Sequence, residues 1–176
     1  MTRSLLHGIA SSMVVVVLAS GAGGKNSATA QQPARTAAPA DLCALLTEAE
    51  AEAILAKPLA APERQANGDC WYPEEPGSGG GEIILHVLPV RFDSKEAFHA
   101  FLVKEHKALD DKLKRAMEKS GATVQETVVE PAPEVGAPAY YADPSLFVLK
   151  DAMVLAIFAE RPQAVAVAAK ALPRFK

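Results

Sequence analysis

The sequence predicts an α+β fold, in which an antiparallel sheet of about five or six strands packs against two or three helices. Short β-rich runs cluster late in the chain, and a long run with apolar residues at helical spacing interrupts them. Turn signals join neighbouring strands closely, which favours antiparallel pairing. Helices grouped on one antiparallel sheet are typical of an α+β sandwich.

The composition limits the classes of protein to which the chain can belong. Its 176 residues suffice for one domain, and a hydrophobic fraction of 49% excludes disorder over the full length. The net charge of −3 lacks the basic surplus of a dedicated nucleic-acid binder, and an aromatic fraction of 6% provides no base-stacking platform. We therefore expect a globular protein that binds no nucleic acid.

The N-terminal region has the order of a secretory signal. Arg3 lies in a short polar start, an apolar run follows from Ile9 to Ala19, and small residues come next. Cleavage after Ala30 is preferred, and cleavage after Ala22 is the alternative. The predicted organisation is a secretory signal peptide at 1–30, a flexible linker at 31–40 and a single disulfide-stapled α+β domain at 41–176.

The processed protein is expected to be soluble and exported, either periplasmic or extracellular. Gly21 stands where a lipoprotein signal carries its lipidated Cys, so no stable membrane anchor remains after cleavage. Removal of the cations Arg3 and Lys25 changes the net charge from −3 to −5, which disfavours binding to anionic membranes. The alternative is an uncleaved anchor from Leu5 to Gly24, a stretch without Lys, Arg, Asp or Glu.

The chain has two cysteines, Cys43 and Cys70, and both lie in the exported domain. An oxidising compartment favours a disulfide between them. The alternative is a metal or redox pair, but the chain has neither a C-x-x-C motif nor a Cys–His cluster. A disulfide is therefore the preferred interpretation.

Capping signals predict the first helical elements. Asp41 can cap a short turn over residues 42–46, and Thr47 with Glu50 forms a capping box. The helix that this box opens is expected to run to about Lys57 and to stop before the following proline.

Two strands are expected next. Cys70–Tyr72 follows the turn signal Asn67–Asp69, and Glu82–Val90 follows the loop Pro73–Gly81. Both faces of the second strand carry apolar side chains, so both are expected to be partly covered. The two sets are Ile83, Leu85 and Val87 on one face and Ile84, His86 and Leu88 on the other.

A long helix is expected after Asp93, where a second capping box ends at Glu96. It should run to Ser120 and stop at Gly121. Its apolar residues recur at helical spacing: Phe98, Phe101, Leu102, Leu109, Leu113, Ala116 and Met117. The charged residues of the opposite face are expected to be solvated: Lys104, Lys107, Asp111, Lys114, Arg115 and Glu118.

The last part of the chain alternates short strands with turns and ends in a helix. The expected strands are Thr123–Val129, a short strand that includes Tyr140 and Tyr141, and the hairpin runs Leu146–Leu149 and Ala152–Ala159. The expected breaks are Pro131–Pro133, Asp143–Pro144 and the hairpin turn at Lys150–Asp151. A final helix should begin near Pro162 and end at Pro173.

Three short motifs carry a family resemblance. They are D-x-C-x-L-L-T-x-x-E from Asp41 to Glu50, the pair Cys70-Trp71, and V-G-x-x-A-Y from Val135 to Tyr140. In these motifs the chain resembles an uncharacterised family of exported bacterial proteins and lipoproteins that is common in actinobacteria. The likeness spans Asp41 to Leu172. The chain departs from the family pattern in lacking the lipobox Cys and in placing Trp71 directly after Cys70.

The resemblance has implications for the fold and the site. It implies a PsbP/Mog1-like fold, which is a curved antiparallel sheet backed by helices, and a Cys43–Cys70 bridge. It assigns no catalytic residues. It implies an accessory or binding protein of the cell envelope.

The residues hold no recognisable catalytic constellation. Three histidines remain after signal cleavage: His86, His99 and His106. His106 and Asp110 have the i, i+4 spacing that can hold one metal ion, although a surface ion pair is the commoner use of that spacing. No serine lies in a nucleophile motif, and Gly77–Gly81 lacks the Lys of a phosphate loop. The sequence therefore predicts no enzyme, no cofactor and no metal site.

Four residues are candidates for binding a ligand or partner: Tyr140, Tyr141, His86 and Trp71. Tyr140 and Tyr141 alternate faces, so one is expected to be buried and one exposed, and an exposed Tyr beside a sheet can mark a site. For Trp71 and His86 the alternative interpretation is packing in the core.

The predicted function is that of a non-catalytic exported binding or accessory module of the cell envelope, which recognises a protein partner or a small ligand. One alternative is a carrier of a small apolar ligand, with a cavity lined by Phe98, Leu102 and Phe158. The other is a small secreted hydrolase whose titratable groups converge around His86 and Tyr140.

Overall fold

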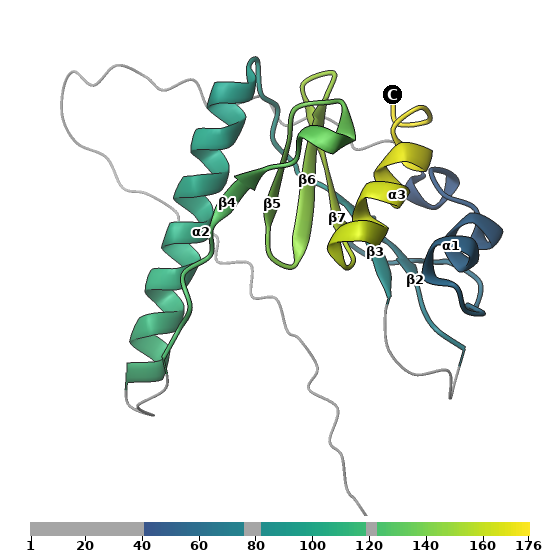
Figure 1. The fold of residues 1–176 in the computed structure, drawn as a ribbon, viewed down its shortest axis with the longest axis horizontal. Coiled ribbons are helices and arrows are strands. Elements are labelled where there is room, and N and C mark those ends of the chain that lie inside the picture. The colour runs from purple at the N-terminus through teal and green to yellow at the C-terminus, as the bar shows by residue number, and fades with distance from the viewer. Residues whose placement is uncertain (1–40, 76–81, 119–122) are drawn as a thin grey trace, which may run out of the picture. The chain divides into compact units, whose positions relative to one another are not determined.

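The computed structural model describes residues 41–75, 82–118 and 123–176, which form seven strands and three α-helices (Figure 1). The α+β class expected from the sequence is confirmed. The seven strands belong to one antiparallel sheet with the order β1-β2-β3-β7-β6-β5-β4. The predicted signal peptide, the linker, residues 76–81 of the predicted loop and the expected helix stop at Gly121 lie outside the described residues.

The elements follow each other closely along the chain. The strands are β1 Glu63–Arg64, β2 Cys70–Tyr72, β3 Ile83–Val87, β4 Val129–Pro131, β5 Ala139–Ala142, β6 Ser145–Lys150 and β7 Met153–Phe158. The helices are α1 Glu48–Leu55, α2 Lys95–Met117 and α3 Arg161–Ala171, with 3-10 turns η1 Leu42–Ala44 and η3 Pro133–Val135. Strand β1 was not expected from the sequence, because two residues cannot display an alternating pattern.

Local capping accounts for the beginning of α1. The Thr47 hydroxyl accepts a hydrogen bond from the Glu50 amide at 3.3 Å, and the Glu50 carboxylate accepts one from the Thr47 amide at 2.9 Å. This is the expected capping box. The helix ends at Leu55 instead of Lys57, because Ala56 adopts the left-handed conformation with φ 55° and its N–H caps the Glu52 carbonyl.

The predicted capping box of α2 is wrong, because the helix begins one residue later than expected. The N-cap is Ser94, whose hydroxyl accepts from the Ala97 amide at 3.1 Å. The third helical position is then Ala97, which has no carboxylate, so Glu96 cannot complete a box with Asp93. The Ser94 hydroxyl satisfies the Ala97 amide, one position after the Glu96 amide that the predicted Asp93 cap was expected to bind.

The predicted strand Thr123–Val129 is largely wrong. Strand β4 pairs only with β5, and Val129 already faces Ala142, the last residue of β5. Residues 123–128 therefore extend past the end of their neighbouring strand. The β6–β7 hairpin is confirmed, but its turn lies at Asp151 and Ala152, one residue later than expected, because Lys150 still pairs with Met153. The two turn residues have φ values of 50° and 65°, as a tight two-residue turn requires.

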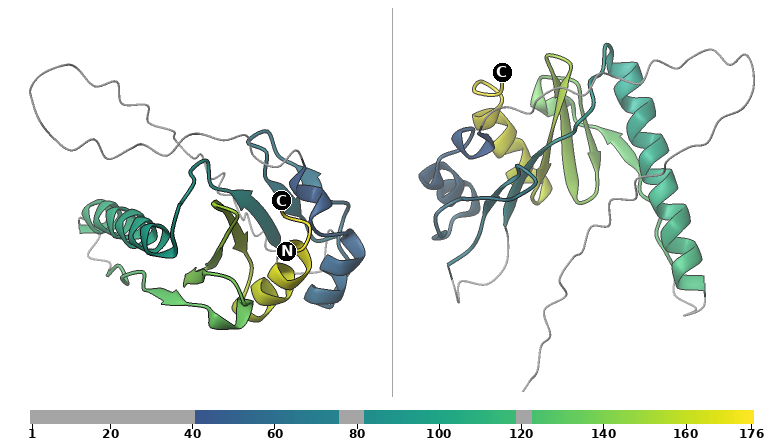
Figure 2. Two further views of the ribbon diagram at one scale, coloured as in Figure 1. Left: turned by 90° about the horizontal axis from the view of Figure 1, so that it is seen from above. Right: turned by 180° about the vertical axis from the view of Figure 1, so that it is seen from behind.

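Each face of the sheet has its own helical cover (Figure 2). Helices α1 and α3 lie on one face, where the largest buried side chains include Tyr72, Leu46, Ile83, Leu85, Leu146, Leu155, Ile157 and Phe175. The first half of α2 lies on the other face, where the buried residues are Phe92, Phe98, Leu102, Ala142, Phe147, Leu149, Val154 and Ala156. Strands β6 and β7 are covered on both faces, which explains their continuous apolar runs.

The predicted disulfide between Cys43 and Cys70 is present, with a Cα–Cα distance of 5.1 Å. It joins η1 to β2. The adjacent Tyr72 is fully buried, and its hydroxyl donates to the Leu46 carbonyl at 2.6 Å. The disulfide and this hydrogen bond together attach the N-terminal turn to the sheet.

Helix α1 is also joined to the C-terminus by an ion pair. The Arg174 guanidinium donates to both oxygens of Glu50, at 2.6 and 2.8 Å. These bonds make the largest contribution, and the hydrogen bond from the Thr47 amide the next largest, to lowering the pKa of Glu50 from 4.5 to about 2. Because the pKa in the folded state lies below that in the unfolded state, Glu50 contributes stability above about pH 5 and this contribution disappears as the pH falls towards 2.

We therefore expect the Glu50→Gln variant to have a flatter dependence of melting temperature on pH than the wild type between pH 6 and pH 2. Circular dichroism melts across this range measure the slope. The matched control is Glu48→Gln, which removes a carboxylate from the same helix without touching Arg174 and should keep the wild-type slope. Identical slopes for wild type and Glu50→Gln would contradict this role of the ion pair.

Candidate functional site

Two of the predicted site residues, Trp71 and His86, lie together on one face of the sheet. Trp71 is opposite Ile84 in the β2–β3 pairing, and Ile84 is opposite Phe158 in the β3–β7 pairing. Their side chains point away from α1 and α3, while α2 crosses the other end of the same face over β4 and β5. All four residues are half-buried. We call Trp71, Ile84, His86 and Phe158 the open sheet face.

Carboxylates hold the polar ring atoms of the open sheet face. The Trp71 Nε1–H donates to Glu82 Oε2 at 2.7 Å, and His86 Nδ1 lies 2.5 Å from Asp69 Oδ1. These contacts orient both rings and give the open sheet face an acidic border. No hydroxyl or thiol that could act as a nucleophile accompanies the His86–Asp69 pair in the contacts of the described residues.

The two tyrosines lie on opposite faces of β5, as their alternation predicts. Tyr140 is half-buried and its ring packs on Phe98 and His99 of α2, at centroid distances of 5.5 and 4.7 Å. Tyr141 is buried, and its hydroxyl donates to Glu134 at 2.7 Å. Burial, and then the hydrogen bond to Glu134, raise the pKa of Tyr141 to about 12. The expectation of one exposed Tyr is wrong, because α2 covers Tyr140, and both rings serve packing within the fold.

His86 and Tyr140 do not converge. They lie in one row across the sheet, in which His86 is opposite Ala156, Ala156 is opposite Phe147, and Phe147 is opposite Tyr140. Strands β7 and β6 separate them, which corresponds to about 14 Å. The buried Phe147 ring occupies the row between them. This arrangement does not favour the hydrolase alternative.

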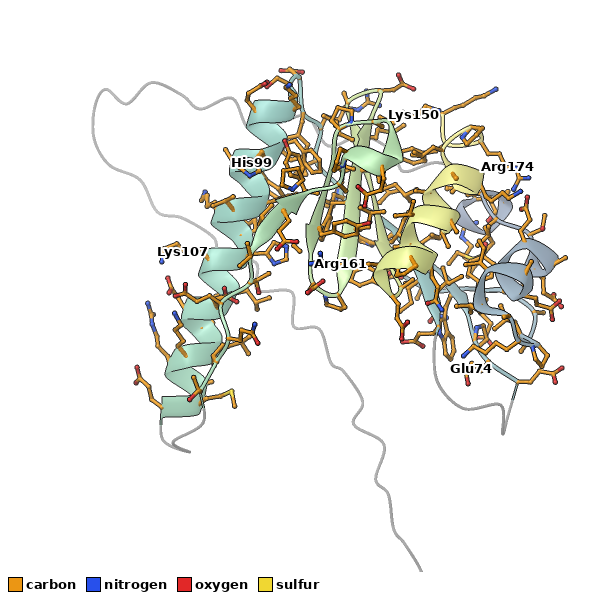
Figure 3. All side chains as sticks on the ribbon, in the orientation of Figure 1. Glu74, His99, Lys107, Lys150, Arg161 and Arg174 are labelled. Carbon is orange, nitrogen blue, oxygen red and sulfur yellow. A yellow bond between two sulfur atoms is a disulfide. The ribbon has the colours of Figure 1, made fainter. Side chains whose placement is uncertain are left out.

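An ion-pair cluster around Arg161 was not found from the sequence. Its guanidinium donates to Glu130 at 2.8 Å and to Asp143 at 3.3 and 3.4 Å, and it lies 4.7 Å from the centre of the Tyr141 ring (Figure 3). The cluster joins the beginning of α3 to β4 and to the β5–β6 turn. Its members are far apart in the chain, so no local motif could indicate it. Because Glu130 and Asp143 both bind the Arg161 guanidinium, the cluster links these elements to one another.

The second half of α2 forms a projecting arm with the extended residues that follow it. Figure 1 shows α2 running past the β5–β6 turn, with residues 123–128 alongside. The Thr127 amide and hydroxyl donate to the two oxygens of Asp110, at 2.8 and 3.0 Å. Lys114 pairs with Glu126 at 2.5 Å. We call residues 103–117 of α2 together with residues 123–128 the α2 arm.

Asp110 and His106 have different partners, although their spacing could suit a metal ion. Asp110 is only 5% exposed, and the hydrogen bonds from Thr127 lower the pKa of its carboxyl. The His106 ring packs against Phe147 at 5.7 Å, and burial lowers its pKa. The described residues contain no group of three or more His, Cys, Asp or Glu side chains that could hold a metal ion.

A groove of about 310 Å³ lies between α2 and residues 126–129. Charged and polar side chains line it together with two valines: His99, Val103, Lys107, Asp110, Asp111, Lys114, Glu126, Thr127 and Val129. Phe98 and Leu102, which were expected to line an apolar cavity, are fully buried within the core under α2. Side chains therefore fill the region in which the carrier alternative places its ligand.

The strongly exposed large apolar side chains of the described residues all lie on the α2 arm. They are Val103 at 43%, Leu109 at 49%, Leu113 at 42%, Met117 at 36% and Val128 at 63% exposure. Leu109 and Leu113 continue the stripe that begins with Phe98 and Leu102. The first half of the stripe meets the sheet, whereas the second half extends beyond it.

No family model, no curated protein and no solved structure matches this chain. The resemblance to an exported bacterial family therefore stays a prediction.

The helices of the described residues include none with the length and apolar character that a membrane span requires.

Proposed function

We propose that this protein is an exported, non-catalytic binding module of the cell envelope and that its partner is another protein. The observation that carries the proposal is the concentration of strongly exposed apolar side chains on the α2 arm. Contiguous apolar surface on a water-soluble domain is a common mark of a protein interaction site, because exposure of such side chains to water is unfavourable.

Two further features support this proposal. The Cys43–Cys70 disulfide is a bond that persists in oxidising, extracytoplasmic compartments, in agreement with the predicted signal peptide. The separation of His86 from Tyr140 and the filled core at Phe98 and Leu102 favour a binding surface over a hydrolase or an apolar carrier.

The test is chemical cross-linking of the tagged full-length protein in intact cells, followed by mass spectrometry of the captured material. We expect one envelope protein to be captured reproducibly and to form a complex with the purified domain in size-exclusion chromatography. The captured protein should be lost with Leu109→Ser/Leu113→Ser and kept with Lys104→Ser/Ala108→Ser, a control pair with the same spacing on the same helix. Recovery of the wild-type protein without any partner would contradict the proposal.

A further inference from the structure

Asn67 and Gly68 lie in the turn that joins β1 to β2. The Gly68 amide donates to the Gln65 carbonyl at 2.9 Å, and the Gln65 amide donates to the Asp69 carbonyl at 2.9 Å. Gly68 has a φ of 92°, a conformation that favours glycine. This is the hydrogen-bond pattern of a short hairpin loop that closes on a glycine.

The Asp69 carboxylate connects this turn to the open sheet face. Its Oδ2 accepts a hydrogen bond from Asn67 Nδ2 at 2.7 Å, and its Oδ1 lies 2.5 Å from His86 Nδ1. The Asn67 Oδ1 accepts a further bond from the Asp69 amide at 3.1 Å. Asn67 is exposed, whereas the Asp69 side chain is only 16% exposed. A change of charge on the Asn67 side chain therefore acts on the carboxylate that holds His86.

An asparagine followed by a glycine has an intramolecular nucleophile beside its side-chain amide. The Gly68 nitrogen attacks Asn67 Cγ, and the new C–N bond closes a five-membered succinimide. The Cγ–Nδ2 bond breaks, and Nδ2 leaves as ammonia with the proton of the Gly68 amide. Water then opens one of the two imide carbonyls, which gives Asp or isoAsp. Glycine hinders this attack least, because it has no Cβ.

The folded turn restrains this reaction. The Gly68 amide hydrogen is directed at the Gln65 carbonyl, and both polar atoms of the Asn67 side chain are bound to Asp69. The Gly68 nitrogen must face Asn67 Cγ in order to attack it, so these hydrogen bonds have to open first. Strand β1 has two residues and lies at the edge of the sheet, so this opening is local and does not require global unfolding.

We propose that Asn67 is a self-deamidation site, that its hydrogen bonds to Asp69 restrain the reaction, and that the product alters the open sheet face. Deamidation replaces the Nδ2 donor by a carboxylate oxygen opposite Asp69, so a hydrogen bond becomes a repulsion between like charges. The isoAsp product also lengthens the backbone of the loop by one carbon atom. This inference goes beyond the proposed function and does not depend on the α2 arm.

The first test measures the deamidation rate at neutral pH by mass spectrometry of peptides from the purified protein. We expect Asn67 to react at least roughly tenfold more slowly in the native protein than in urea. Asp69→Ala should accelerate the native reaction at least roughly threefold and leave the rate in urea unchanged. The matched control Glu82→Ala removes the carboxylate that binds Trp71, does not touch Asn67 and should keep the native wild-type rate.

Circular dichroism first establishes that both variants are folded under the native conditions. Equal rates for the wild type in buffer and in urea would overturn the restraint by the turn. Equal native rates for Asp69→Ala and Glu82→Ala would overturn the part of Asp69 in it.

The second test examines the product through the Asn67→Asp variant. We expect a melting temperature about 2–4 °C below that of the wild type and shifted NMR signals of the His86 ring. In the Asp69→Ala background the same substitution should cost clearly less stability, because the carboxylate that it repels is absent. Unchanged His86 signals in Asn67→Asp, or equal losses of melting temperature in the two backgrounds, would overturn the effect of deamidation on the open sheet face.

Discussion

Replacing Cys43 by Ser lowers the free energy of unfolding by about 3–4 kcal/mol and the melting temperature by about 10–15 °C. The disulfide closes a loop with a sequence separation of 27, and its removal restores the conformational freedom of that loop in the unfolded chain. The folded state loses as well, because the N-terminal turn is then held to the sheet only by non-covalent contacts, which include the buried side chains of Leu42 and Leu46 and the Tyr72–Leu46 hydrogen bond. Thermal denaturation in oxidising buffer measures the loss.

Two controls identify the bond as the cause. Cys70→Ser and the double variant Cys43→Ser/Cys70→Ser should lose the same stability as Cys43→Ser, because one bond is broken in each case. Reduction of the wild type should give a similar melting temperature. An unchanged melting temperature for Cys43→Ser in oxidising buffer would show that the bridge does not stabilise the domain.

Replacing Phe98 by Ala lowers the free energy of unfolding by about 3–5 kcal/mol. The Phe98 ring is fully buried, 5.4 Å from the Phe92 ring and 5.5 Å from the Tyr140 ring. It lies where α2 meets the sheet, so its removal leaves a cavity and weakens the attachment of the whole α2 arm. Urea denaturation of wild type and variant gives the difference.

The same helix offers controls of graded burial. Phe101 is half-buried and lies 5.0 Å from Phe92, so Phe101→Ala should cost less than Phe98→Ala. Leu109→Ala removes an exposed side chain and should change stability by no more than about 0.5 kcal/mol. Equal losses for Phe98→Ala and Leu109→Ala would mean that both halves of the stripe are buried, which would contradict the exposure of Leu109 and Leu113.

The elements predicted correctly are those whose signals are local. Thr47 and Glu50 satisfy each other's amides within three residues, and the β6–β7 turn is decided by two residues with positive φ. The alternation of β3 placed Leu85 in the core and His86 on the opposite face. Such signals depend on hydrogen bonds and side-chain periods within a few positions, which the order of residues alone specifies.

The elements that were missed depend on partners far away in the chain. Strand β4 begins at Val129 because β5 ends at Ala142, and a single-strand pattern contains no information on the length of the neighbour. Arg161 meets Glu130 and Asp143 only after the chain has turned back on itself. Of the four candidate binding residues, the fold brings Trp71 and His86 to one face and uses both tyrosines for packing.

The sequence by itself determined the α+β class, the cysteine pairing and the periodic apolar stripe of α2, because chain-local periods and a single possible cysteine pair specify them. Only the tertiary structure decided that Phe98 and Leu102 are buried while Leu109 and Leu113 are exposed. The physical reason is geometric. All four residues lie on the same apolar stripe of α2. The sheet ends before the helix does, so only the first two side chains have a partner surface opposite them.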